Sequence, residues 1–185
     1  MSEIEENKEL CKKYPFLVPT NRWTGDIVKD YDYTWTELDS MPEGWRKSFG
    51  ENLCKEIKEA LDKIDEVYSY KVSSNYRILQ IKEKYGRLRW YTNWSTKELD
   101  DIIYKYEDIS IRTCIDCGAP ATKITLNWIS PYCEDCSKNY NKENIAPIEE
   151  YLKGESYENN SKNWNMVKIE DVANVQVGVV IKPSQ

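Results

Sequence analysis

Hydrophobic residues recur every three or four positions in two stretches of the chain, residues 45–64 and 99–109. This spacing predicts two amphipathic helices, the first running to about Val67 and the second to Ile111. Thr96 precedes the second stretch and can cap its helix. The hydrophobic positions of the first helix are Trp45, Phe49, Leu53, Ile57, Leu61 and Ile64.

Residues 76–92 alternate between apolar and polar side chains and predict a β-hairpin that turns at Tyr85-Gly86. A two-residue loop would pair Ile81 with Trp90, whereas a four-residue loop would pair Ile81 with Leu88. Tyrosine is a poor first residue for a two-residue turn, so the longer loop is favoured. The face expected to pack on the first helix carries Leu79, Ile81, Leu88 and Trp90.

Two Cys-x-x-Cys pairs follow the second helix and are separated by 15 residues. Such a pair lets two thiolates from one turn reach one ion, and two pairs complete a tetrahedral shell. The chain has no histidine, so the expected site is formed by cysteines alone and is closed, as in structural zinc sites. We expect one structural Zn²⁺ per chain, held by Cys114, Cys117, Cys133 and Cys136.

These elements predict an α+β fold, with amphipathic helices packed on a small antiparallel sheet and a four-cysteine zinc-ribbon-like knuckle. Residues 1–40 are expected to form an N-terminal helix and a wrapping segment, and residues 41–111 the α/β core that contains the hairpin. Residues 112–137 would form the zinc knuckle. Residues 138–185 read as a polar tether with a strand at 174–182.

Composition and charge narrow the function classes. The 185 residues are 40% hydrophobic and 31% charged, and the net charge is −6. Such an acidic protein is not expected to bind duplex DNA non-specifically. No apolar run is long enough to span a membrane and no export signal is evident, so we expect a cytoplasmic protein. Without histidine, Ser-His and Cys-His catalysis is impossible, and we expect no enzyme.

The hairpin is basic within this acidic chain: residues 71–97 contain seven basic residues and one acidic residue. Like charges opposite each other across a strand pair destabilise it. One interpretation is a solvated face that prevents edge aggregation, and the other is a binding site for an anion. The residues expected at the anion site are Lys82, Arg87, Arg89, Tyr91 and Tyr76.

Several segments resemble a family of small, largely uncharacterised phage and prophage proteins. They are Tyr33-Thr34-Trp35-Thr36-Glu37-Leu38-Asp39, Met41-Pro42-Glu43-Gly44-Trp45, the run Gln80-Ile81-Lys82-Glu83-Lys84-Tyr85-Gly86-Arg87-Leu88-Arg89-Trp90-Tyr91, Thr113–Pro120, and Trp128 with the second cysteine pair. The resemblance covers about residues 33–136. It implies a phage origin and, by association, a role against host defences in the host cytoplasm.

Three functions remain open at this level. The first is a counter-defence protein that binds a nucleotide or another phosphate-rich ligand on the hairpin. The second is a protein-interaction inhibitor of a host defence protein, which it contacts through acidic surfaces and the aromatic-rich segment 14–40. The third is a zinc-ribbon accessory factor that contacts nucleic acid.

Overall fold

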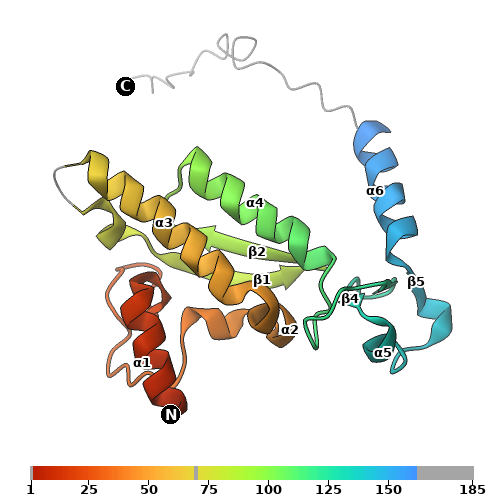
Figure 1. The fold of residues 1–185 in the computed structure, drawn as a ribbon, viewed down its shortest axis with the longest axis horizontal. Helices are drawn as coiled ribbons and strands as arrows, with labels where there is room; N and C mark the ends of the chain where they lie inside the picture. Colours follow the sequence, from red (N-terminus) through yellow and green to blue (C-terminus); the bar gives the residue numbers. More distant parts are fainter. Residues whose placement is uncertain (1, 69–70, 162–185) are drawn as a thin grey trace, which may run out of the picture. The chain divides into compact units, whose positions relative to one another are not determined.

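The structure is a computed structural model that describes residues 2–68 and 71–161. It contains two compact units, Met1–Tyr151 and Leu152–Gln185, and the four cysteines of the two Cys-x-x-Cys pairs lie in the first (Figure 1). The strand predicted at residues 174–182 lies outside the described residues. No helix of the described part is long and apolar enough to cross a membrane.

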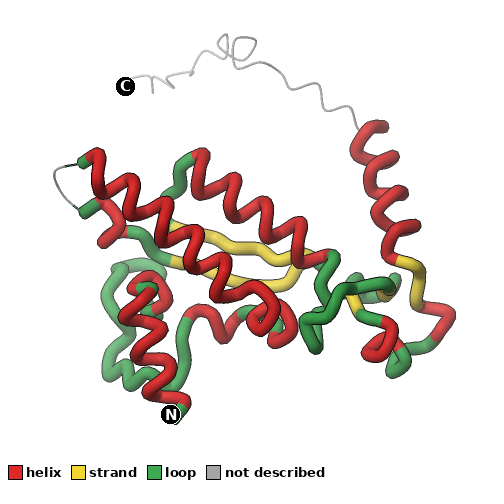
Figure 2. The backbone as a smooth tube through the Cα atoms, viewed as in Figure 1, coloured by secondary structure: helices red, strands yellow, loops and turns green. Residues whose placement is uncertain are grey.

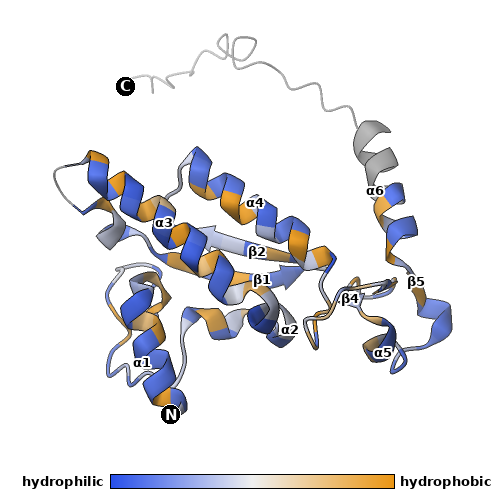
Figure 3. Ribbon diagram, viewed as in Figure 1, coloured by the Kyte–Doolittle hydropathy of each residue, from blue (hydrophilic) through white to orange (hydrophobic). Residues whose placement is uncertain are grey.

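The predicted helices are confirmed with one local difference. Helix α2 (Glu43–Trp45), a π-helical turn (Arg46–Gly50) and α3 (Glu51–Val67) form one continuous stretch, and α4 spans Lys97–Ile111. Thr96 caps α4, since its hydroxyl accepts a hydrogen bond from the Leu99 backbone N–H. Hydrophobic and hydrophilic segments alternate along α3 and α4, as their spacing requires (Figure 3).

Strands β1 (Ile78–Lys84) and β2 (Arg87–Thr92) form the hairpin, but the favoured four-residue loop is wrong. Lys84 pairs with Arg87, so the loop is the two residues Tyr85-Gly86 and Ile81 pairs with Trp90. Both loop residues have positive φ, 53° and 74°, as in a type I′ turn, whose twist matches that of the strands. The backbone therefore tolerates tyrosine at a position that favours asparagine or glycine.

The predicted inward position of Leu79 is also wrong. The strand register shifts between Ile78 and Gln80, and this β-bulge changes which side chains face the core. Ile78 is buried, with 2% exposure, whereas Leu79 is only half-buried. The other three predicted core residues of the hairpin, Ile81, Leu88 and Trp90, are buried.

One hydrophobic core joins the helices, the hairpin and the N-terminal segment. Figures 1 and 2 show α3 and α4 side by side across the hairpin. Helix α1 (Glu3–Lys13) starts with a capping box at Ser2, and the following 3₁₀ turn Pro15–Leu17 buries Phe16 and Leu17. Further 3₁₀ turns span Glu37–Ser40 and Val72–Asn75. The N-terminal segment thus contributes to the core as well as wrapping it.

A second antiparallel sheet lies beside the cysteine pairs, in the order β4-β3-β5. Its strands are β3 (Lys123–Thr125), β4 (Pro131–Tyr132) and β5 (Ile145–Pro147). The short helix α5 (Glu134–Ser137) precedes a 3₁₀ turn (Lys142–Asn144), and α6 spans Ile148–Ser161. Strand β5 lies in the stretch expected to be a tether, and it pairs with β3 instead.

Candidate metal centre

The first cysteine pair sits on a tight turn directly after α4. The backbone N–H of Gly118 donates to the Cys114 carbonyl at 3.0 Å, and the Cys114 N–H donates to the Ala119 carbonyl at 2.7 Å. Gly118 has φ of +81°, a conformation that glycine adopts without steric cost. The turn thereby brings the two thiols of the pair into one cluster.

The second cysteine pair marks the start of α5. The Cys133 thiol accepts a hydrogen bond from the Cys136 backbone N–H at 3.4 Å, so Cys133 acts as the cap of this short helix. The pKa of the Cys133 thiol is lowered to about 7, and this hydrogen bond is the largest cause. A thiol with a lowered pKa is ready to act as a thiolate, the form that binds metals.

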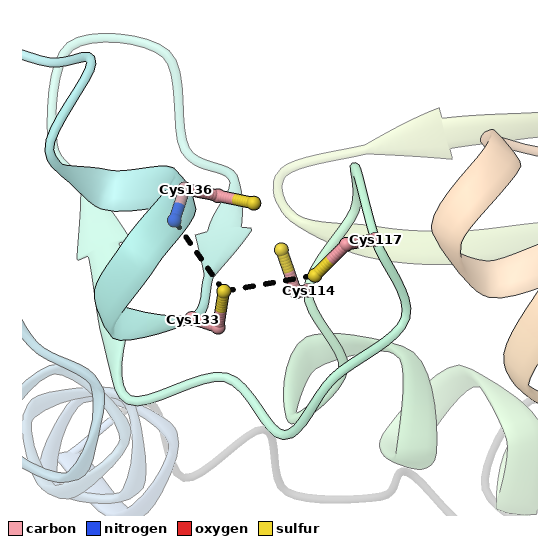
Figure 4. A group of neighbouring side chains, drawn as sticks. All are labelled: Cys114, Cys117, Cys133 and Cys136. Carbon is pink, nitrogen blue, oxygen red and sulfur yellow. Dashed lines mark hydrogen bonds between the residues drawn. The ribbon is translucent and has the colours of Figure 1, made fainter.

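The four predicted cysteines come together in one cluster (Figure 4). Their sulfur atoms all lie within 4.8 Å of one another, and the Cys117 and Cys133 sulfurs are 3.6 Å apart. Cys114 is buried, whereas Cys117 is exposed. Four converging sulfur atoms can hold one metal ion, and no fifth side chain of the described part belongs to the cluster.

Backbone and side-chain hydrogen bonds fix the cysteine cluster to the main helix. The Gly44 N–H donates to the Ile115 carbonyl at 2.9 Å. The Trp45 indole Nε1–H donates to the Thr113 carbonyl, also at 2.9 Å, and Trp45 is fully buried. The first knuckle and the start of the helix therefore form one rigid unit.

The remaining cysteines, Cys11 and Cys54, lie in the hydrophobic core. Burial raises the pKa of both thiols. The Cys11 sulfur lies 3.7 Å from the Tyr31 hydroxyl, and neither cysteine reaches the metal cluster. Both are structural residues with low reactivity.

The basic face of the hairpin differs from the expected anion site. Lys82 lies opposite Arg89 and Lys84 opposite Arg87, so like charges do face each other. However, α4 supplies acidic partners: Arg87 Nη1 lies 2.7 Å from Asp108 Oδ1, and Arg89 Nη1 lies 2.7 Å from Glu107 Oε2. The two arginines are thus already paired within the protein.

The two aromatic residues expected at the anion site, Tyr76 and Tyr91, do not share one face. Tyr76 is buried, with 2% exposure, and packs edge-on against Phe16 and Trp94, so its predicted place on the outer face is wrong. Tyr91 is exposed, and the Lys82 ammonium lies 5.1 Å from its ring centroid. The prediction for Tyr76 assumes that side chains alternate regularly between the two faces of the strand, and the bulge near residue 79 interrupts this alternation.

No protein-family model, curated protein or solved structure matches the chain. The resemblance to small phage proteins therefore stays a prediction.

Proposed function

We propose that this chain is a non-enzymatic binding protein that docks on another protein through an exposed loop around Trp23, and that a zinc ion stabilises its fold. The resemblance to phage proteins supports a host protein as the partner. The single observation that carries the docking proposal is the exposure of Trp23.

Zinc is the metal that best suits the cysteine cluster. Thiolates are soft ligands, and four of them from two Cys-x-x-Cys turns favour zinc in tetrahedral geometry. Cys114, Cys117, Cys133 and Cys136 would hold the ion. A closed shell of this kind supplies folding free energy and leaves no position for a substrate, which supports a structural role.

The loop that carries Trp23 is held in a defined shape. Thr20 and Ile27 form an antiparallel bridge, and the Asn21 side-chain oxygen accepts hydrogen bonds from the backbone N–H groups of Trp23 and Thr24, at 2.8 and 3.1 Å. The Arg77 guanidinium packs against Gly25 so closely that a side chain there would collide with it. The loop therefore presents Trp23 from a fixed backbone.

Trp23 is 95% exposed and Ile27 is 62% exposed. A tryptophan contributes a large apolar area, and leaving it in water on a rigid loop forgoes the free energy of its burial. Tryptophan is also among the residues that dominate binding energy at protein interfaces. Insertion of Trp23 into an apolar pocket of a partner would recover this free energy.

The paired arginines favour this function over ligand binding on the open face of the hairpin. An anion binding there would have to displace Glu107 from Arg89, and the side chains of this pair are only 17% and 26% exposed. A partly buried pair is costly to open. The acidic side chains of α4 already neutralise the charges of Arg87 and Arg89.

A crosslinking experiment tests the docking proposal. A photo-crosslinking amino acid at position 23 should link the chain to one discrete protein in the host cell. The same amino acid at Tyr104, which is 64% exposed on α4, should not. Trp23→Ala should abolish recovery of that protein without changing thermal unfolding, because Trp23 makes no core contact. Equal recovery with Trp23→Ala would refute the proposal.

A further inference from the structure

A groove of 480 Å³ lies where the tip of the hairpin meets the loop between β3 and β4. Three apolar side chains that line the groove are exposed to solvent: Tyr85 (64%), Leu126 (47%) and Trp128 (76%). This size is within the range of small-ligand sites. The groove is distinct from the Trp23 loop and adjoins the basic face of the hairpin at Lys84.

Both walls of the groove are fixed. On the hairpin side, the Gly86 N–H donates to Glu83 Oε1 at 2.6 Å. On the other side, the Thr125 hydroxyl accepts from the Ser130 N–H at 3.1 Å and donates to the Trp128 carbonyl. The walls touch at Gly86, where an added Cβ would lie 3.1 Å from Ile129 Cγ2. The hairpin tip and the β3–β4 loop are therefore in close contact at the groove.

Tyr85 occupies this position at an energetic cost. Its φ of 53° lies in the left-handed region, which only glycine and, to a lesser degree, asparagine and aspartate adopt readily. Its ring is mostly exposed, so core packing does not compensate. A strained residue with an exposed side chain indicates a function for that side chain.

Positive charge adjoins the aromatic walls. Lys84 and Glu83 line the groove; the Glu83 carboxylate is engaged by the Gly86 N–H, and the Lys84 ammonium lies 5.3 Å from the Tyr85 ring centroid. Lys82 follows on the same face of β1 and donates to the Gln80 side chain at 2.8 Å. Within the described residues, neither lysine is paired with a carboxylate, in contrast to Arg87 and Arg89.

We propose that this groove binds a nucleobase that carries a phosphate group, either as a free nucleotide or within a single-stranded nucleic acid. The base would stack on Tyr85 and Trp128, since aromatic rings accept any base face. The phosphate would lie at Lys84, and a continuing strand would reach Lys82. The two unpaired lysines provide the charge complementarity that a purely apolar protein segment would not use.

Titration of the metal-loaded protein with two probes tests this site, with ATP as the free nucleotide and a short oligothymidylate as the single strand. Trp128→Ala and Tyr85→Asn should each weaken binding about fivefold or more, because that factor is the lower end of what stacking of one base contributes. Asparagine suits the backbone at position 85, so this variant keeps the turn. Lys84→Ala should weaken binding and, for oligothymidylate, also reduce its salt dependence. Tyr104→Ala is the matched control and should bind normally.

The probe that binds identifies the source of the ligand. Tight binding of ATP alone supports a free nucleotide, and salt-dependent binding of oligothymidylate supports a single strand. If wild type binds neither probe at millimolar concentration, the proposal is wrong and the groove would suit an apolar protein segment. Undiminished binding by both Trp128→Ala and Tyr85→Asn would also overturn it. None of these outcomes depends on the Trp23 loop.

Discussion

Gly44 and Gly118 face each other where the main helix meets the first knuckle. A Cβ atom at Gly44 would lie 2.7 Å from the Gly118 backbone nitrogen, and one at Gly118 would lie 2.6 Å from the Gly44 carbonyl oxygen. Side-chain carbons do not approach backbone atoms this closely, so the contact requires glycine at both positions.

Gly44→Ala should therefore destabilise the protein. The added methyl group would push the knuckle from the helix, and overpacking of this kind costs about 1–3 kcal/mol. Chemical denaturation of the metal-loaded protein measures the loss. Gly154→Ala is the control, because a Cβ at Gly154 meets no atom within 4 Å. It should be neutral or slightly stabilising in helix α6, and a similar loss in both variants would contradict this account.

Replacement of a metal ligand should have a larger effect. Cys136→Ser should lose the metal and unfold the region around the two knuckles, because structural zinc contributes on the order of 10 kcal/mol. Metal analysis and unfolding with and without a chelator measure this. Cys11→Ser should keep one zinc per chain, since Cys11 lies outside the cysteine cluster. Purified protein without zinc would contradict the assignment.

The two arginine pairs of the hairpin should differ in strength. Arg89→Ala would leave the largely buried Glu107 carboxylate unpaired and should cost about 1–3 kcal/mol. Arg87→Ala should cost less than about 1 kcal/mol through the loss of its pair with Asp108, because Asp108 is 81% exposed and water replaces its partner. Urea denaturation of both variants makes the comparison. An equal loss would show that burial of the carboxylate does not decide the cost.

The cost of Arg89→Ala should also depend on pH. Burial raises the pKa of Glu107 above its usual value of 4.5, and the charge of Arg89 opposes this rise. Without Arg89 the pKa of Glu107 rises further, so the folded state takes up a proton more readily than the unfolded state. The loss of unfolding free energy in Arg89→Ala should be largest near neutral pH and should shrink as the pH falls towards the pKa of Glu107. A pH-independent deficit would exclude Glu107 as its source.

Because of the bulge in β1, we expect the adjacent residues Ile78 and Leu79 to contribute differently to stability. Ile78→Ala should cost about 2–5 kcal/mol because Ile78 is buried, and Leu79→Ala should cost clearly less. Thermal unfolding of the two variants measures the difference. The opposite order would mean that Leu79 faces the core and that the strand has no bulge.

Regular periodicity explains which elements the sequence predicts correctly. The three- and four-residue spacing of α3 and α4 is set by helix geometry, and the cysteine spacing by the needs of one ion. The wrong predictions occur where a single residue interrupts the regular spacing of the side chains. The bulge shifts the inward side from Leu79 to Ile78, and the positive φ of Tyr85 shortens the loop. The bulge has no local sequence signal, and the tyrosine at the first loop position is the reason that the sequence favours the longer loop.

The partners of the basic residues could not be predicted for a different reason. Glu107 and Asp108 lie near the end of α4, and only the packing of α4 on β2 brings them to Arg89 and Arg87. Likewise, the pairing of β5 with β3 joins segments about 20 residues apart without a strong apolar pattern. Contacts of this kind depend on the tertiary arrangement.

The burial of Cys11 and Cys54 has a practical consequence. Both thiols are shielded from solvent, so a thiol reagent added to the native protein would react only at the cysteine cluster, where Cys117, Cys133 and Cys136 are accessible. A metal ion bound there would protect those four as well. The number of thiols that react quickly would then rise in proportion to the number of empty metal sites, and a simple colorimetric assay could follow metal loading in solution.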